Sequence, residues 1–329
     1  MPPLTIVMYH YVRPIADGRF PGLRGLEPAQ FSGQLDYIMQ HYRPVSLVQL
    51  LEAIEGGREL PERAILLQFD DGYTDHVDYV LPELERRAIK GVFFPITSAA
   101  LDRRIIVANR VQFILARVHD LDALIVDMER AVSEMGAGRN LLPLSEYRRR
   151  HFVATRIDVA PVIYVKRMFQ VALPADLSEE VSSVLFRKHV AADEASFADE
   201  LYLSEQGIRR LIDAGHHVGC HSESHPWMGS LSKEKQRSEI VSALRLHDRI
   251  GLPRRGFTFC YPYGDYNSDT LDVLTELECA AGFTAEVALA APSRANRLVL
   301  PRLDTIDLPM AASADPNPWT RRAVPALSS

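Results

Sequence analysis

The sequence predicts a parallel α/β fold interrupted by a long helical segment, and three observations lead to this prediction. Short apolar runs alternate with stretches of helical periodicity, as strands and helices alternate in parallel α/β proteins. This alternation stops near residue 101 and resumes after residue 201. Between these points apolar residues recur at helical spacing, with little sign of a strand.

The first 100 residues contain three predicted strands. Residues 4–9 (LTIVMY) form a buried strand that ends at His10, and residues 64–69 (AILLQF) form a second that ends at Asp70-Asp71-Gly72. The third covers residues 90–96 (KGVFFPI). Apolar residues at helical spacing predict helices over 31–39, 47–54 and 77–88.

The second half of the pattern follows the helical segment. Helices are predicted over 204–214, 231–250 and 268–279, and strands over 216–220, 257–261, 281–287 and 297–303. The tail is rich in Pro, Ser and Ala, a composition that favours disorder. We therefore expect a main fold from residues 1–100 and 202–310, a helical insertion over 101–201, and a flexible tail over 311–329.

Composition places the chain among ordinary globular proteins. With 329 residues, 47% of them hydrophobic, it has enough apolar material for a core without disulfides. The net charge of -6, from 37 basic and 43 acidic residues, argues against nucleic-acid binding. Three cysteines without a CxxC pair indicate a reducing compartment. Since no signal peptide and no apolar run long enough for a membrane span is present, we expect a cytoplasmic protein without stable membrane insertion.

Two adjacent carboxylates, Asp70 and Asp71, follow directly after a predicted buried strand. In parallel α/β folds, catalytic groups and ligands collect at the carboxyl ends of the strands. Adjacent carboxylates repel each other, and a divalent metal relieves the repulsion by taking one as a ligand, which leaves the other as a base. The plain alternative is an Asx turn or a helix N-cap, because Asp-Asp-Gly is a common turn sequence.

A second candidate motif, His221-Ser222-Glu223-Ser224-His225, also follows a predicted strand. Two histidines at this spacing can bind one ion when the backbone between them makes a single turn, and neutral imidazole suits zinc. With Asp71 they make three protein ligands, the number typical of a catalytic zinc site with an open position. A pair of polar loop histidines without a metal is the alternative.

A third motif, Cys260-Tyr261-Pro262-Tyr263-Gly264, follows another predicted strand. Aromatic residues between Pro and Gly form a rigid loop that suits stacking against a sugar ring; an ordinary turn packed by two tyrosines is the alternative. A Ser- or Cys-dependent hydrolase is disfavoured, because the sequence has no GxSxG elbow and Cys220 lies inside an apolar strand.

Together, QFDDG, HSESH and CYPYG resemble, in order, the motifs of the polysaccharide deacetylase family (carbohydrate esterase family 4), over roughly residues 1–100 and 204–305. The resemblance implies a distorted (β/α) barrel with an inserted helical subdomain. It also implies that Asp70 is the general base, that Asp71, His221 and His225 hold a divalent metal, and that the backbone N–H of Tyr263 binds the oxyanion. We expect Zn²⁺, although cobalt, nickel or iron suit the same ligands.

The chain departs from the family pattern at two positions. The family places an acid histidine in a C-terminal LxH motif, whereas no histidine follows His247 here. Because Met8-Tyr9-His10 resembles that motif in circularly permuted relatives, we predict that His10 is the general acid. Cys260 stands where the family has an arginine that steadies the base, and Arg302 is the candidate replacement; a surface salt bridge is the alternative for Arg302.

The predicted reaction is hydrolysis of an N-acetyl or N-formyl amide on an amino sugar. A cytoplasmic enzyme would act on a nucleotide- or lipid-linked intermediate of surface polysaccharide biosynthesis. Tyr73, Tyr261 and Trp227 are the candidate substrate-binding residues, and the helical insertion is a candidate lid or homo-oligomer interface. Hydrolysis of a non-sugar amide and a catalytically silent glycan-binding protein are the alternatives; the intact set of base and ligands disfavours the silent protein.

Overall fold

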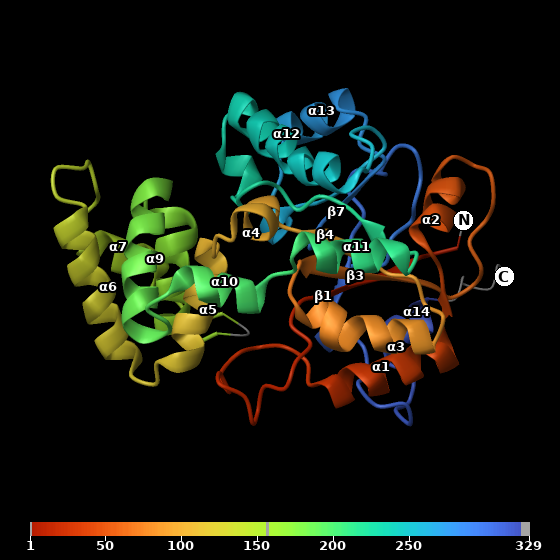
Figure 1. Cartoon of the computed structure of the whole chain (residues 1–329), viewed down its shortest axis with the longest axis horizontal. Coiled ribbons are helices and arrows are strands. Elements are labelled where there is room, and N and C mark those ends of the chain that lie inside the picture. Colours follow the sequence, from red (N-terminus) through yellow and green to blue (C-terminus); the bar gives the residue numbers. More distant parts are fainter. Residues whose placement is uncertain (1, 156–157, 324–329) are drawn as a thin grey trace. The chain divides into compact units, whose positions relative to one another are not determined.

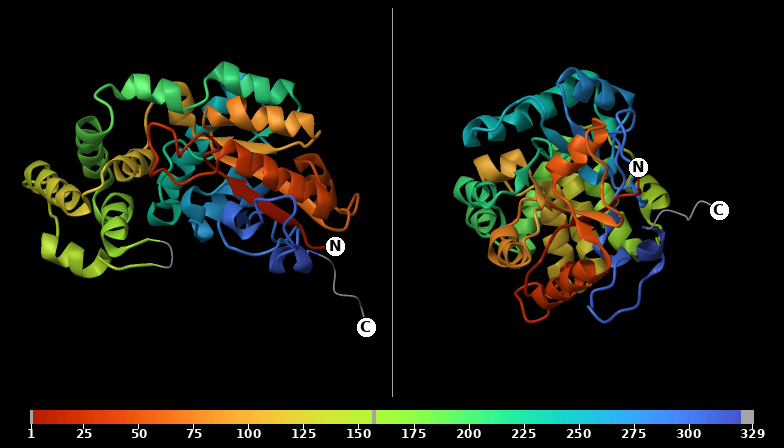
Figure 2. Two further views of the ribbon diagram at one scale, coloured as in Figure 1. Left: turned by 90° about the horizontal axis from the view of Figure 1, so that it is seen from below. Right: turned by 90° about the vertical axis from the view of Figure 1, so that its right-hand side faces the viewer.

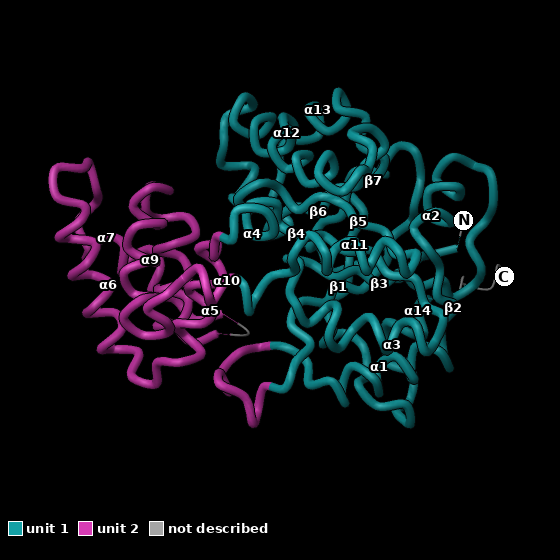
Figure 3. The backbone as a smooth tube through the Cα atoms, in the orientation of Figure 1, with its two compact units in different colours: residues 1–14, 25–103, 199–329 teal, residues 15–24, 104–198 magenta. Residues whose placement is uncertain are grey.

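A computed structural model of the chain describes residues 2–155 and 158–323 (Figure 1). The chain divides into two compact units (Figure 3). The barrel unit comprises Met1–Pro14, Gly25–Arg103 and Asp199–Ser329, and the helical unit comprises Ile15–Arg24 and Arg104–Ala198. In the part of the chain that the structure describes, no helix is both long and apolar enough to cross a bilayer.

The barrel unit is built on short strands that pair in parallel. One sheet has the order β5-β4-β3-β1-β8, with β2 beside β3, and β6 and β7 form a second sheet. Isolated parallel bridges join Cys220, just after β5, to Phe259 in β6, and join Phe283 in β7 to Leu300, just before β8. The second sheet therefore lies between the two edges of the first. The predicted distorted (β/α) barrel is therefore confirmed. The strands are β1 (Thr5–Tyr9), β2 (Arg43–Pro44), β3 (Ala64–Asp71), β4 (Val92–Pro95), β5 (His217–Val218), β6 (Thr258–Cys260), β7 (Ala281–Phe283) and β8 (Leu303–Asp304).

Helices lie on the outer side of these strands (Figure 2). Local sequence sets their ends: Ser232 caps α12 by accepting a hydrogen bond from the Lys235 N–H, and Gly251, with φ of 80°, ends it. Predicted helix 77–88 divides into a π-helical turn, η1, and α3. The helices of this unit are α1 (Pro28–His41), α2 (Leu47–Ile54), η1 (His76–Val80), α3 (Leu81–Arg86), α4 (Thr97–Asp102), α11 (Glu205–Asp213), η3 (Met228–Ser230), α12 (Lys233–Ile250), η4 (Pro262–Gly264), α13 (Ser268–Glu276), η5 (Thr305–Asp307) and α14 (Pro318–Arg322).

Strand register brings the N-terminal histidine beside the paired aspartates. In the β1–β3 pair, Thr5 lies opposite Ile65 and Tyr9 lies opposite Phe69. His10 and Asp70 each follow one residue later, at the same end of the sheet. All eight residues of β3 are buried, as expected for a parallel strand that is covered on both faces. The register thus explains how residues 60 positions apart in the sequence meet at one edge.

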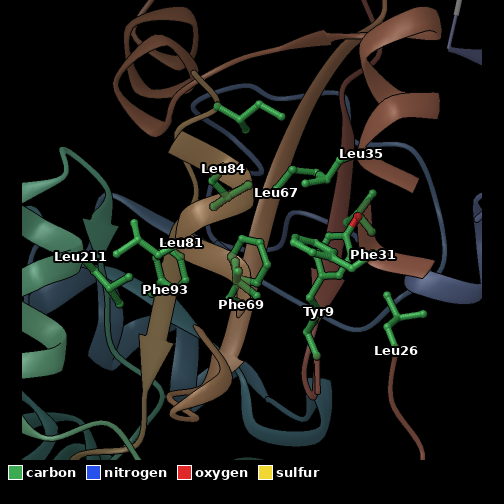
Figure 4. Close-up of a cluster of buried hydrophobic side chains, with 14 of the residues drawn as sticks. Tyr9, Leu26, Phe31, Leu35, Leu67, Phe69, Leu81, Leu84, Phe93 and Leu211 are labelled. Carbon is green, nitrogen blue, oxygen red and sulfur yellow. The ribbon is translucent and has the colours of Figure 1, made fainter. Parts of the chain in front are cut away.

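Aromatic packing holds this edge of the sheet in place (Figure 4). The Phe69 ring stacks against Phe93 with centroids 4.7 Å apart and against Tyr9 with centroids 5.1 Å apart. Phe31 from α1 contacts Tyr9 edge to face. The other three rings belong to β1, β3 and β4, and Tyr9 and Phe69 directly precede His10 and Asp70. The core therefore lies directly beneath the strand ends that carry the candidate catalytic residues.

The helical unit lies within the predicted insertion over 101–201 and adds the loop 15–24. The loop belongs to it because the Phe20 ring packs against Phe113 and Phe197, 4.9 Å and 5.8 Å away between centroids. Because these contacts join residues far apart in the sequence, the periodicity of the loop itself could not predict them. The helices are α5 (Val107–Arg117), α6 (Leu121–Met135), α7 (Leu144–His151), α8 (Ala160–Arg167), η2 (Met168–Ala172), α9 (Ala175–His189) and α10 (Glu194–Leu201), the last of which extends into the barrel unit.

The expectation of a flexible tail over 311–329 does not hold for residues 311–323, which pack on the barrel unit. The buried Thr320 hydroxyl hydrogen-bonds with the Tyr37 hydroxyl at 2.8 Å and accepts one from Tyr42 at 2.9 Å. Trp319 packs against the core beside it. Composition alone misled the prediction, because a few specific contacts anchor a segment that is polar on average. Residues 324–329 lie outside the described part of the chain.

Candidate metal and catalytic site

Three side chains predicted as metal ligands converge at the end of β3. Asp71 Oδ1 lies 3.3 Å from His221 Nε2 and 3.6 Å from His225 Nε2. One ligand atom from each of the three residues lies within 4.8 Å of the others, and all three side chains are buried. Strand β3 supplies the carboxylate, and the loop after β5 supplies both imidazoles.

The donor atoms of this trio suit a divalent cation. Asp71 Oδ1 is buried and has no hydrogen-bond partner among the residues that the structure describes. His221 Nδ1 donates to the Cys260 carbonyl at 2.8 Å, which fixes the ring so that Nε2 faces Asp71. Burial, together with His221, lowers the pKa of His225 to about 3, so its imidazole is neutral at pH 7. Two imidazoles and one carboxylate form a common zinc set with an open position.

Local electrostatics also favour a positive charge at this point. Burial alone would lower the pKa of His221, but interactions with Cys260, Asp71 and Asp70 outweigh burial and raise it well above the usual value. Burial would raise the pKa of Asp71, but the close contact with His221 and the nearby His225 and His10 lower it. Asp71 is therefore ionised, as a metal ligand must be.

Backbone conformation at the site is unusual. Non-glycine residues with positive φ cost roughly 1–3 kcal/mol each, so surrounding contacts must hold them in place. His225 N–H donates to Ser222 Oγ at 2.9 Å, and Ser224 N–H donates to Glu239 at 3.0 Å. These bonds tighten the loop so that both imidazoles face Asp71. The site residues with positive φ are Asp71 (70°), Ser222 (61°), His225 (60°) and Tyr263 (57°).

Arg302 lies against the predicted base, Asp70. Its Nη1 is 3.0 Å from Asp70 Oδ1 and 2.9 Å from Oδ2, and both side chains are 2% exposed. Its Nε donates to the Thr284 carbonyl at 2.8 Å, and the Cys260 thiol donates to Asp70 Oδ2 at 3.4 Å. Burial would raise the pKa of Asp70, but Arg302, His221 and His10 hold it below its usual value. Asp70 is therefore ionised, as a general base must be.

His10 occupies the open side of the site. Its Nε2 lies 3.9 Å from Asp70 Oδ2, beyond hydrogen-bond distance, and its side chain is 40% exposed. The structure thus brings the predicted acid beside the predicted base, with solvent access that the base lacks. The roles of both residues stay predictions at this point.

Of the three predicted substrate-binding residues, the structure leaves only Trp227 in a position to meet a ligand. Tyr73 is fully buried and its hydroxyl donates to Asp71 Oδ2 at 2.5 Å. Tyr261 is 1% exposed and donates to the Leu298 carbonyl at 2.7 Å. The expectation that these two rings stack on a sugar is therefore corrected: Tyr73 orients the Asp71 carboxylate and Tyr261 belongs to the core. Trp227 is partly exposed and stacks on Tyr263 with centroids 4.8 Å apart.

Sequence reasoning missed the contacts that support the site from behind. The Cys260 carbonyl, the Tyr73 hydroxyl and the Glu239 carboxylate each orient a loop or ligand. Tyr73 was singled out in the sequence, but as a substrate-binding ring and not as a support for Asp71. Glu239 sits on α12, 15 residues after its partner Ser224. No pattern in the sequence marks such a pairing.

Comparisons with known proteins point to one family. A model of the polysaccharide deacetylase family matches residues 57–127 and 173–282, more than half of the chain. The poly-beta-1,6-N-acetyl-D-glucosamine N-deacetylase of Escherichia coli (strain K12) is 37% identical over 84 residues. That match covers 25% of this chain and 12% of the Escherichia coli protein, so the chain spans only a small part of that relative's length.

Solved structures show the same fold over nearly the whole chain. The Streptococcus pyogenes deacetylase PplD aligns with a TM-score of 0.57 and 17% identity, covering 95% of this chain and 96% of that protein. IcaB from Ammonifex degensii aligns with a TM-score of 0.54 and 18% identity, covering 98% of this chain and 96% of that protein. With its three motifs gathered in one site and the family match over most of the barrel, the chain belongs to the polysaccharide deacetylase family, whose members are carbohydrate N-deacetylases.

Proposed function

We propose that the chain hydrolyses the N-acetyl or N-formyl amide of an amino sugar, with a divalent metal held by Asp71, His221 and His225. The single observation that carries this proposal is the convergence of an ionised base, Asp70, with that buried ligand trio and an accessible imidazole, His10. A protein that only binds glycans has no need for a base beside three metal ligands.

Each residue has one chemical task in this reaction. A divalent cation at the trio would act as a Lewis acid that polarises the amide carbonyl and makes water more acidic. Asp70 accepts a proton from the attacking water as its oxygen bonds to the carbonyl carbon, and Arg302 keeps Asp70 ionised beforehand. The backbone N–H of Tyr263 stabilises the developing oxyanion. His10 protonates the nitrogen as the C–N bond breaks, which yields a free amine and a carboxylic acid.

The substrate proposal is an amino sugar on a nucleotide or lipid carrier, used in surface polysaccharide biosynthesis, and the metal proposal is Zn²⁺. The stacked Trp227–Tyr263 pair beside His225 supports a ring-shaped ligand. The relative that acts on poly-beta-1,6-N-acetyl-D-glucosamine supports N-acetylglucosamine as the sugar. It also makes the polymer itself the second substrate to test.

The test is release of acetate by zinc-loaded protein from four N-acetylated compounds: UDP-N-acetylglucosamine, a polyprenyl-phosphate-linked N-acetylglucosamine, a β-1,6-linked N-acetylglucosamine pentamer and a chitin pentamer. We expect release from at least one, lost in Asp70→Asn without loss of bound metal. Turnover of the pentamers but not of the linked monosaccharides would overturn the carrier proposal alone. Sugar binding without turnover would favour the glycan-binding alternative.

A further inference from the structure

The backbone that carries His10 is fixed by one neighbouring segment, residues 71–76. Four successive residues after β1 are each contacted by this segment: His10, Tyr11, Val12 and Arg13. We propose that Asp75 is a positioning residue that, through Val12 and Arg13, sets the reach of His10 toward the leaving nitrogen. The proposal rests on the assignment of His10 as the acid made above.

Asp75 makes the central contacts of this arrangement. Its Oδ2 accepts a hydrogen bond from Val12 N–H at 3.0 Å and another from Arg13 Nε at 2.8 Å. Its Oδ1 accepts from Arg13 Nη2, so the guanidinium binds the carboxylate with two nitrogens. The Asp75 residue is 2% exposed. A buried carboxylate that binds both a backbone N–H and a guanidinium fixes direction as well as distance, which a surface ion pair does not.

Two further contacts extend the same support. His76, fully buried, lies with its Nε2 3.1 Å from the His10 carbonyl oxygen. Burial lowers the pKa of His76 to about 4, so the imidazole is neutral and its Nε2–H donates to that carbonyl. Tyr11 stacks on Tyr73 with ring centroids 4.1 Å apart. Because Tyr73 also donates to Asp71, one short segment orients both a metal ligand and the acid.

His10 depends on its backbone for position. Its ring is 40% exposed and 3.9 Å from Asp70 Oδ2, so that contact is too long to orient the ring. A displacement of about 1 Å at a catalytic group can cost roughly 100-fold in rate. Asp75, whose carboxylate contacts the residues at positions 12 and 13, therefore controls the acid without touching the substrate.

The experiment compares Asp75→Asn with wild type on two substrates that differ in their need for an acid. The amide substrate is the β-1,6-linked N-acetylglucosamine pentamer, whose leaving amine must be protonated. The ester substrate is 4-nitrophenyl acetate, whose phenolate leaves without a proton. Asp78→Asn is the matched control, since Asp78 lies in the same turn but is exposed. Arg13→Lys, which keeps the charge but loses the two-nitrogen contact, serves if Asp75→Asn folds poorly.

We expect kcat for the amide to fall about 10- to 100-fold in Asp75→Asn, with KM and bound zinc near wild type and ester hydrolysis nearly unchanged. Arg13→Lys should show a smaller loss of the same kind, and Asp78→Asn none. Equal loss on amide and ester would overturn the proposal, because it would mean general structural damage. Unchanged amide turnover would overturn it as well.

A second readout separates this proposal from the proposed function. If wild type hydrolyses no amide, the proposed function fails, but the positioning claim is still tested by side-chain nitrogen NMR of the histidines in zinc-loaded protein. We expect the His10 resonances to shift in Asp75→Asn while those of His221 and His225 stay in place. His10 resonances identical to wild type would contradict the role of Asp75.

Discussion

The two sides of the candidate site differ in how tightly the protein holds them. On the inner side, the Asp70 and Arg302 side chains are each 2% exposed and form an ion pair. Asp71 accepts a hydrogen bond from Tyr73. On the outer side, His10 is 40% exposed and has no such short side-chain contact with Asp70. In the proposed reaction the inner groups must keep fixed charges before substrate arrives, whereas His10, as the proposed acid, acts where the leaving group departs. The difference indicates that preorganisation is concentrated on the side proposed to hold the metal and the base.

The largest loss of activity should come from replacing the proposed base, Asp70, on the inner side. Asp70→Asn keeps the shape but cannot accept a proton, so we expect amide turnover to fall about 10²- to 10⁴-fold. Product release measured under saturating substrate checks this. Bound metal should stay near wild type, because Asp70 is not among the three ligands; loss of the metal in Asp70→Asn would contradict the division of roles between Asp70 and Asp71.

On the outer side, His10→Gln should reduce amide turnover by about 10²-fold, less than loss of the base. The reason is that water can supply a proton on the exposed side more readily than it can replace a buried carboxylate. Comparing an amide with an aryl ester isolates the effect, since the ester needs no acid. If both substrates lost rate equally, His10 would have some role other than protonating the leaving group.

Replacing Arg302 by Met tests how the inner side depends on pH, both in stability and in reaction rate. Arg302 holds the pKa of the buried Asp70 below its usual value in the folded protein. The ion pair therefore contributes its full free energy of stabilisation at pH values above the carboxyl pKa of the unfolded chain. This contribution is lost as the pH falls through the lower pKa of the folded protein. Without Arg302 the buried Asp70 has a raised pKa. We expect a loss of about 3–5 kcal/mol in unfolding free energy near pH 7 and an acidic limb of the rate profile shifted to higher pH.

Chemical denaturation and a pH–rate profile of Arg302→Met measure the two effects separately. Arg294→Met is the control, because Arg294 pairs with Glu55 on an exposed surface. A rate profile of Arg302→Met that kept the wild-type acidic limb would argue that Asp70 does not depend on this arginine.

The smallest effect concerns the support behind the ligand trio. Tyr73→Phe removes the hydrogen bond to Asp71 Oδ2 without changing the ring that stacks on Tyr11. We expect zinc affinity to fall about 10- to 100-fold, as for other partners of metal ligands. Competition with a zinc chelator measures it. Tyr9→Phe, which removes a buried hydroxyl bonded to Gln34 away from the trio, should leave zinc affinity unchanged.

The barrel and the residues at its strand ends were predictable, because they depend on local patterns. Apolar runs marked β1 and β3, and motifs directly after the strands marked Asp70, Asp71, His221 and His225. The supporting contacts were not predictable. Arg302 reaches Asp70 across 232 positions of sequence, and its alternative assignment to a surface salt bridge fails only because the structure buries it.

Average composition was the weakest guide. The segment from residue 311 reads as a flexible tail, yet the Thr320 hydroxyl bonds with two buried tyrosines. Tyr73 and Tyr261 read as sugar-binding rings because they are aromatic and lie in the motifs. Both are buried, and each hydroxyl has an acceptor within the protein. Side-chain direction and burial decide such roles, and they depend on contacts that single motifs do not encode.

The most direct test of the proposed site is the metal content of zinc-reconstituted protein, measured by elemental analysis in wild type, Asp70→Asn, His221→Ala and His225→Ala, with circular dichroism to confirm folding. We predict about one ion per chain in wild type and Asp70→Asn, and loss of the ion in both folded histidine variants. A wild type that stays metal-free after reconstitution, or histidine variants that retain the ion, would contradict the assignment of Asp71, His221 and His225 as the metal site.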